Sequence, residues 1–600
     1  MSLNGLFRSP SMSRSPVLTL SIWLAIAACW SVPFLIAPHT YPIPTFYSEF
    51  AAAICWTALT IAVVSLGWGG RVGLPAIALA PLALIAVLIL QLLVAPPINT
   101  FFSFAAVAFL LAAVASTWLG ARCRDMPGML EALAVGVIVG GVLTVSVELL
   151  HLFRVPGLPS EFFSITPAGT ARRMWGNLNQ PNHVASYLAF GLAACLFLAQ
   201  RFRRWRIVLA VIALSFLLGM ALTISRVTWL HVIVVGVLAG PAWSTRVRGA
   251  ARWLAAAAPA LLLVAAYQVC NWIVSYANVL WHLDLPGSLG QRMQEGAGER
   301  VLLWRHAWHI FLAHPWLGGG WGDYAWNQYV QTDLLGNVEM SLNAHNIVLD
   351  LLAKVGLLGL LAVALPSLGF VWRLRKRPMT PAWSFLLSII LVLGAHSMLE
   401  YPLHYLFFLL PLAFALGYLD MRTLRFPTGR MAWASVGVVS LCAVVLLVRL
   451  WGNYVSAERL QYGFTSQPRQ PAGYHEHGPT LLLPYESLAK ASQWKVGPET
   501  AESLMPLERR AVQFYPGPNT VQRYALALAY LGKTEEAVVQ VRRLHSQYWT
   551  DYANQSWLVA QACGQDHEEM LKTFCARLRS EKLLLTIDRS SDGDSLTASQ

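Results

Sequence analysis

Thirteen apolar runs, each close to twenty residues long, constrain the fold of this chain more than any other feature. A helix needs about 20 apolar residues to cross the hydrocarbon core of a bilayer, where its backbone polar groups must bond to one another. Hydrophobic residues make up 56% of the 600 positions and charged residues 12%, so the composition excludes a soluble enzyme. The sequence therefore predicts an all-α polytopic membrane protein, with spans at about 17–37, 49–69, 74–95, 100–120, 129–150, 183–200, 206–224, 228–243, 253–276, 346–372, 382–399, 403–420 and 431–451.

The positions of arginine and lysine predict the orientation of these spans. Positive residues concentrate in short cytoplasmic loops. Here they mark every second junction, at Arg8 and Arg14, Arg71, Arg122 and Arg124, 201–206, 246–252, 373–377 and 422–430. We therefore expect a cytoplasmic N-terminus and, because the span count is odd, an exported C-terminal tail. We also expect the first span to be retained, because it lacks a small-residue cleavage site. Most of the net charge of +13 lies in these loops, so we expect no nucleic-acid binding.

The chain divides into two predicted domains. Residues 1–451 hold the spans and a large outer loop at about 277–345, and residues 452–600 form a small helical tail outside the membrane. Within the tail, residues 525–544 resemble one tetratricopeptide unit, a pair of helices with a turn at 531–533. We expect this tail to pack on the outer face of the membrane domain.

Two cysteines, Cys563 and Cys575, reach the exported tail. Their compartment permits oxidation, and the break at 564–566 between two helical patterns could bring them together. A disulfide and a pair of buried thiols are the two alternatives.

His345 is the first candidate for chemistry. It stands with Asn343, Ala344 and Asn346 at the end of a polar loop, directly before an apolar span. The positive end of a helix dipole lowers the pKa of an imidazole and favours its neutral form, which is the form that a general base needs. The alternative is a histidine that only caps the helix.

Other outer segments also hold unusual polar residues. Arg226 lies in a turn at 223–226 that is too short to lift it far from the bilayer, so it either binds an anion or extends its side chain to the interface. The turn at 396–405 crowds ionisable groups together and predicts a polar cavity. Glycines at 318–322 lack the preceding strand of a nucleotide-binding loop, so we interpret them as a turn.

These motifs together resemble the O-antigen ligase and polymerase superfamily of bacterial inner membranes. The motifs that carry the resemblance are 179–182 (NQPN), Ser225 with Arg226, Arg300 with Trp304, His314 with Pro315, and 344–346 (AHN). Two more, 39–49 and 396–403, are similar to the PglL-like protein O-oligosaccharyltransferases that glycosylate pilins. The chain departs from the pattern at Lys354, where an acidic residue is common in relatives.

The resemblance implies a GT-C-like helical bundle with an outward, periplasmic cavity in the bacterial inner membrane. It implies a donor of undecaprenyl-pyrophosphate-linked oligosaccharide, transferred en bloc to serine or threonine hydroxyls of a pilin-like acceptor protein. His345 would be the base, and Arg226 and Arg300 would clamp the pyrophosphate, with Arg172 or Arg173 as a third cation. Side chains that would contact the donor or support the site are Gln180, Asn182, Tyr401, His39, Glu49, His396 and Glu400.

We expect no cofactor, because no group of residues shows convincing metal spacing and arginines can stabilise the leaving group. We also expect transfer to invert the anomeric centre. An O-antigen ligase that acts on the lipopolysaccharide core, or a polymerase, would use the same donor chemistry. A lipid or solute transporter is a different class. It fits less well, because the polar residues gather on one face, with no inverted repeat or pair of broken helices in the sequence.

Overall fold

The computed structural model describes residues 16–65, 73–169, 172–244, 249, 251–286, 298–424, 430–462, 480–564 and 569–584. Several positions used above lie outside the described residues: Arg8, Arg14, Arg71, Arg246, residues 565–566 of the predicted break, and part of the outer loop.

Helices dominate the described chain, as predicted. Ten of them are long and apolar enough to cross a membrane, and three shorter apolar helices occur within the same described ranges. All thirteen predicted runs coincide with helices. Their bounds are α1 Pro16–Cys29, α2 Phe46–Ser65, α3 Leu79–Val94, α4 Thr100–Cys123, α5 Met129–Leu152, α6 Pro181–Arg201, α7 Arg206–Leu222, α8 Val227–Ser244, α9 Ala251–Trp281, α13 Ile347–Leu374, α14 Pro381–Ser397, α15 Leu406–Leu419 and α16 Arg430–Tyr462.

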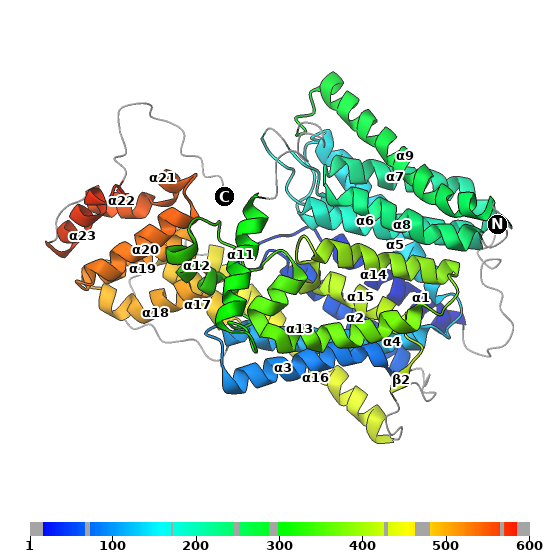
Figure 1. Cartoon of the computed structure of the whole chain (residues 1–600), viewed down its shortest axis with the longest axis horizontal. Helices are drawn as coiled ribbons and strands as arrows, with labels where there is room; N and C mark the ends of the chain where they lie inside the picture. Colours follow the sequence, from blue (N-terminus) through cyan, green and yellow to red (C-terminus); the bar gives the residue numbers. More distant parts are fainter. Residues whose placement is uncertain are drawn as a thin grey trace.

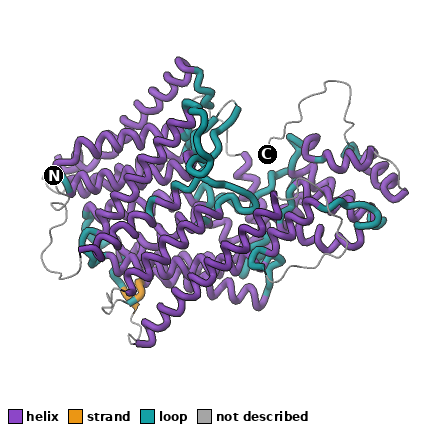
Figure 2. The backbone as a smooth tube through the Cα atoms, turned by 180° about the vertical axis from the view of Figure 1, so that it is seen from behind, coloured by secondary structure: helices purple, strands orange, loops and turns teal. Residues whose placement is uncertain are grey.

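These helices run side by side in one bundle (Figure 1). Helix α6 is buried along almost its whole length, so apolar side chains cover it on every side. Single-turn helices connect several segments, at η2 Val32–Phe34, η3 Ala76–Ala78, η4 Gly176–Leu178, η5 Arg203–Trp205 and η6 Pro402–His404. One short antiparallel pair, β1 Leu74–Pro75 and β2 Thr423–Leu424, lies at the end of the bundle away from the tail (Figure 2).

Close backbone contact between helices depends on small residues in the bundle. Where α4 meets α15, a Cβ atom at Gly417 would lie 1.9 Å from the carbonyl oxygen of Thr117, and one at Gly120 would lie 2.1 Å from that of Phe414. Lipid tails are as apolar as the helices, so small residues that let backbones approach are a main source of helix association. The two glycines therefore bring α4 and α15 into contact.

Helix α13 is broken inside the membrane. Gly356 has φ +64, which interrupts the helix one third of the way along, and the loop at 315–319 covers the break. The Pro315 and Trp316 carbonyls accept from the Leu357 and Leu358 amides at 2.8 and 3.2 Å. The apolar pattern of this run does not reveal the break, and the predicted glycine turn has the specific role of pairing with it.

A layer of helices covers the end of the bundle next to the tail; this layer, called the outer layer, begins with α11 Gly298–Ala313 and α12 Tyr324–Leu335. Helix α11 buries Leu303, His306, Ala307 and Ile310 and lies at a steep angle to the bundle (Figure 1). The tail follows with α17 Leu483–Gln493, α18 Ala501–Phe514, α19 Pro518–Tyr530, α20 Thr534–Gln547, α21 Tyr552–Gln555, α22 Trp557–Gly564 and α23 Glu569–Ser580.

The tail packs on the outer layer through α12. Tyr329 is fully buried in the tail core, and its hydroxyl donates to Gln540 at 2.8 Å. Arg543 pairs with Asp333 at 2.5 Å. Helices α19 and α20 meet at the turn where the repeat pattern places it. Helix α16 continues through residue 451, so the division into two domains at that point stays a prediction.

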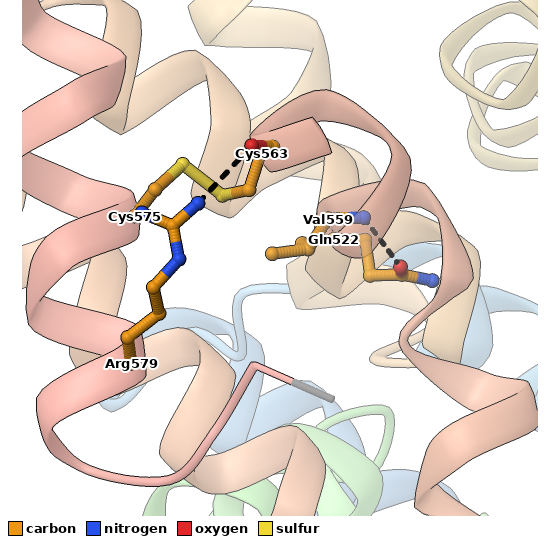
Figure 3. The surroundings of a disulfide bond; sticks show 5 residues. All are labelled: Gln522, Val559, Cys563, Cys575 and Arg579. Atoms are coloured by element: carbon orange, nitrogen blue, oxygen red, sulfur yellow. Dashed lines mark hydrogen bonds between the residues drawn. A yellow bond between two sulfur atoms is a disulfide. The ribbon is translucent and has the colours of Figure 1, made fainter. Parts of the chain in front are cut away.

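Cys563 of α22 and Cys575 of α23 form a disulfide, with their Cα atoms 5.6 Å apart (Figure 3). Both residues are buried in the tail core. Gln522 accepts from the Val559 amide at 3.1 Å, which links α19 to the same hairpin. The disulfide therefore holds α23 against α22 at the far end of the tail.

Candidate functional site

A small polar cavity lies at the end of the bundle where α6, α8, α11 and α14 meet. Its volume is about 80 Å³. Most of its lining had been singled out from the sequence: Arg173, Asn182, Ile224, Arg226, Val227, Arg300, His396, Leu399 and Glu400.

Two helices begin at this cavity. Gln180 caps α6, where its side-chain oxygen accepts from the His183 amide at 2.7 Å, and Asn182 lies in the first turn. Helix α8 begins at Val227, directly after Arg226. The N-terminus of a helix carries a partial positive charge and unpaired amides, so it favours anions. Both helix ends add to the positive potential of the cavity.

Three arginines surround the cavity. Arg226 is exposed, and its guanidinium has no hydrogen bond or ion pair within the described part of the chain. Arg300, one third exposed, contacts Glu400 at 3.3 Å. Arg173 donates to the Thr223 carbonyl at 2.9 Å and to Asn182 at 3.3 Å. With Glu400 as the one carboxylate, the charged side chains of the cavity sum to +2.

Glu400 organises the polar residues of the cavity. One of its oxygens accepts from Asn182 and Arg300, and the other from Gln180 at 2.9 Å and His396 at 3.3 Å. Burial by itself would raise the pKa of Glu400, but the hydrogen bond from His396 and the nearby positive charges lower this pKa to about 2. Glu400 is therefore a carboxylate near neutral pH.

The structure brings His183, His396 and Glu400 together, with their ligand atoms within 4.8 Å of one another. Two imidazoles and a carboxylate are a donor set that divalent transition metals accept. Here both Glu400 oxygens already accept from amide or guanidinium donors, and the second ring nitrogen of His396 contacts the Ser186 hydroxyl at 2.8 Å. The set fits a hydrogen-bond network better than a metal centre. Metal independence stays a prediction.

His345 lies beside the cavity rather than in its wall. Its ring meets the Tyr401 ring edge-on, with centroids 4.9 Å apart. The next residue, Asn346, donates to the Met398 carbonyl at 3.1 Å and so attaches this segment to the turn that carries Glu400. Asn346 also caps α13, because its side-chain oxygen accepts from the Val348 and Leu349 amides. His345 is therefore not the cap of the helix.

The pKa of His345 is lowered, as the sequence predicted, but for a different main reason. Burial is the largest cause, the Glu400 charge raises this pKa, and the Arg300 charge lowers it. Burial also raises the pKa of Tyr401, which keeps the phenol protonated. The segment therefore presents a neutral imidazole next to a phenol.

Three predicted site residues, Arg172, His39 and Glu49, lie away from the cavity. Arg172 is buried and donates to the carbonyls of His151, Leu152 and Leu283, so it closes the end of α5 instead of forming a third clamp. Of the two neighbouring arginines, the structure brings only Arg173 to the cavity.

His39 and Glu49 brace the backbone around the site. The ring nitrogens of His39 lie 2.9 and 2.6 Å from the carbonyl oxygens of Pro44 and Asn177. Glu49 accepts from the Leu406 amide at 2.6 Å. Their place in the structure agrees with support rather than with contact to a ligand in the cavity.

Two further groups lie near the site: Ser225, which the sequence indicated only as the neighbour of Arg226 in a motif, and Asp350, which it did not indicate. Ser225 donates to Asn182 at 2.5 Å and fixes the amide that Glu400 also contacts. Asp350, in the second turn of α13, accepts from the Ala344 amide directly before His345. Its spacing of four residues from Lys354 is the one signal that could have indicated a pair.

Three family models match the chain: "O-Antigen ligase" at residues 210–364, "Virulence factor membrane-bound polymerase, C-terminal" at 384–562, and "Protein glycosylation ligase" at 174–199. The first contains Arg226, Arg300 and His345, and the last contains Gln180 and Asn182.

Two curated relatives come from Acinetobacter baylyi. A general O-oligosaccharyltransferase is 25% identical over 417 residues, which is 63% of this chain and 68% of the relative. A ComP-specific O-oligosaccharyltransferase is 22% identical over 259 residues, which is 42% of this chain and 45% of the relative.

The helical membrane bundle and these matches indicate a glycosyltransferase similar to those of the O-antigen ligase class. Enzymes of this class take a glycan from a lipid-linked donor. Within the class, the chain is similar to the PglL-like protein O-oligosaccharyltransferases.

Proposed function

We propose that this protein transfers an oligosaccharide en bloc from undecaprenyl pyrophosphate to serine or threonine hydroxyls of exported proteins such as pilin. The observation that carries the proposal is the cavity itself, with three arginines, one carboxylate and two helix N-termini. Its side-chain charge of +2 matches the two negative charges of a pyrophosphate diester. We place the site on the periplasmic side of the bacterial inner membrane, in line with the distribution of basic loops.

The residues around the cavity suit an inverting displacement. His345 would take the proton of the acceptor hydroxyl as the hydroxyl oxygen bonds to the anomeric carbon of the first sugar. The bond from that carbon to the phosphate oxygen would break, and the pyrophosphate would leave with the electron pair. Arg226, Arg300 and Arg173 would stabilise the charge that develops on it.

A protein acceptor is favoured by the two relatives, which are both named O-oligosaccharyltransferases. The match to the O-antigen ligase model favours a second candidate, transfer of the same glycan to the lipopolysaccharide core. The donor half of the reaction is common to both, so the acceptor decides between them.

The test is the intact mass of a pilin-type acceptor produced with a lipid-linked glycan pathway in a ligase-deficient bacterial host. We expect a gain of one glycan mass with this protein, and no gain with His345→Ala at equal protein level. His282→Ala is the matched control, because His282 is an exposed histidine with a similar left-handed backbone, φ +48 against +53 for His345. A restored lipopolysaccharide ladder with no change in acceptor mass would instead identify an O-antigen ligase.

A further inference from the structure

A buried ionic cluster lies directly behind His345. Asp350 and Lys354 are one turn apart on α13, only 2% and 3% exposed, and their charged atoms are 3.0 Å apart. His404 reaches the same Asp350 oxygen at 3.1 Å, and Lys354 also donates to the side chain of Asn343. Two charges buried together need several partners, because each loses its hydration. The proposed reaction uses none of these four side chains.

The cluster is attached to the backbone that carries His345. The second oxygen of Asp350 accepts from the Ala344 amide at 2.9 Å. On the other side of His345, the side chain of Asn346 caps α13 and contacts the Met398 carbonyl. His345 therefore lies between Ala344, which is held by Asp350 of α13, and Asn346, which is held as the cap of α13.

The conformation of His345 requires such restraint. Its φ is +53, in the left-handed region that residues with a Cβ atom rarely occupy. A residue persists there when its surroundings fix the backbone on both sides, and such positions cluster at functional sites. Without the bond from Ala344 to Asp350, the segment loses the restraint on the residue directly before His345.

Lys354 keeps Asp350 in place. Its ammonium group lies 5.6 Å from the Trp321 ring centre and 6.0 Å from that of Tyr324. The two aromatic rings and Asp350 therefore all attract this ammonium group and hold it in place. The turn that carries it is fixed by the covered break in α13, where the Gly319 amide donates to the Ala353 carbonyl at 2.8 Å. Gln91 donates to the Lys354 carbonyl at 2.8 Å.

We propose that Asp350, held by Lys354 and His404, is a positioning residue that sets the orientation of His345 through the Ala344 amide. Asp350 touches neither the donor nor the acceptor. This inference rests on the proposed role of His345 as the base.

Two matched double variants separate positioning from ion pairing. Asp350→Asn with Lys354→Met removes both charges but keeps an oxygen that can accept from Ala344. Asp350→Leu with Lys354→Met removes both charges and that acceptor, with a side chain of nearly the same size. The ion pair is absent from both, so loss of the pair alone affects them equally.

We expect the Asn variant to keep kcat within about threefold of the parent protein. The Leu variant should lose about 100-fold in kcat, the effect typical of a misplaced catalytic group, with the KM for the lipid-linked donor nearly unchanged. Hydrogen exchange of a peptide that covers 342–346 supplies a readout without activity. The Ala344 amide should exchange slowly in the parent and the Asn variant and quickly in the Leu variant.

Equal kcat and equal exchange in the two double variants would overturn the proposal, even if His345→Ala abolishes transfer. If the parent protein moves no glycan to any protein, the proposed function fails, but the exchange measurement still decides whether Asp350 holds the Ala344 amide. If the Leu variant does not fold, Asp350→Asn compared with Asp350→Ser, both combined with Lys354→Met, gives the same contrast, because the serine oxygen is one bond closer to its own backbone and falls short of the Ala344 amide.

Discussion

Replacement of Arg226 by lysine tests the arginine clamp most directly, because the exchange keeps the charge and changes only its shape. At about 4 Å and an effective dielectric constant near 20, the attraction between unit charges is about 4 kcal/mol, and lysine retains it. Lysine loses the second of two parallel hydrogen bonds to the phosphate oxygens. A hydrogen bond to a charged group contributes roughly 1.5–3 kcal/mol, which corresponds to about 10- to 150-fold in kcat/KM.

The structure narrows the expected loss of kcat/KM and predicts which arginine variant loses more. Arg226 is exposed in the cavity, so we expect the lower end, about tenfold. Arg300→Lys should cost less, because Arg300 already shares its charge with Glu400 at 3.3 Å. Arg154→Lys is the control, since Arg154 is an exposed arginine outside the cavity that pairs with Asp284 at 2.7 Å.

The assay is the initial rate of glycan transfer from a synthetic lipid-pyrophosphate donor to an acceptor peptide, with purified variants in detergent. The reasoning is refuted if Arg226→Lys retains full kcat/KM, or if Arg154→Lys loses as much as Arg226→Lys. A larger loss in Arg300→Lys than in Arg226→Lys would show that the Glu400 contact does not reduce the role of Arg300.

Three further predictions follow from the same geometry. Because the pKa of His345 is lowered from its ordinary value of 6.5, kcat/KM in a pH–rate profile should hold at pH 6.5 and fall only at lower pH. Arg300 lowers this pKa and Glu400 raises it, so Arg300→Met should move the fall to higher pH and Glu400→Gln to lower pH. Transfer should continue in excess EDTA, whereas a loss restored by a divalent metal would place an ion at His183, His396 and Glu400. Gly417→Ala should lower thermal stability in detergent by about 1–3 kcal/mol, since its Cβ would meet a backbone carbonyl, while Gly394→Ala, with no atom within 4 Å, should not.

Some site residues could be predicted because their chemical type conflicts with their surroundings. Arg226 next to the bilayer and the crowded turn at 396–405 are costly unless they share a polar cavity, and the structure places Arg226, His396 and Glu400 in one. The sequence cannot tell which of Arg172 and Arg173 reaches the cavity, because adjacent residues in a loop differ only in the direction of their side chains. The carbonyl groups that accept hydrogen bonds from Arg172 belong to α5 and to the segment after α9, and only the fold brings these segments near Arg172.

The break in α13 and the ion pair of Asp350 with Lys354 were hidden for a related reason. Both lie in a run whose mean composition is apolar, and their stability comes from partners far away in the sequence, such as the loop at 315–319 and His404. The pKa of His345 shows the same limit. A helix N-terminus can be predicted from its pattern, but burial, the larger cause, depends on the packing around it.

The sequence by itself determined which segments enter the membrane, because a bilayer selects helices by length and apolarity alone. It also indicated the chemistry, since arginine and histidine are too costly beside lipid to be there without a partner or a role. Only the tertiary structure decided which of these residues meet. The cavity joins α6, α8, α11 and α14 across more than 200 residues of chain, from Arg173 to Glu400, and contacts at that separation arise from packing that no local pattern encodes.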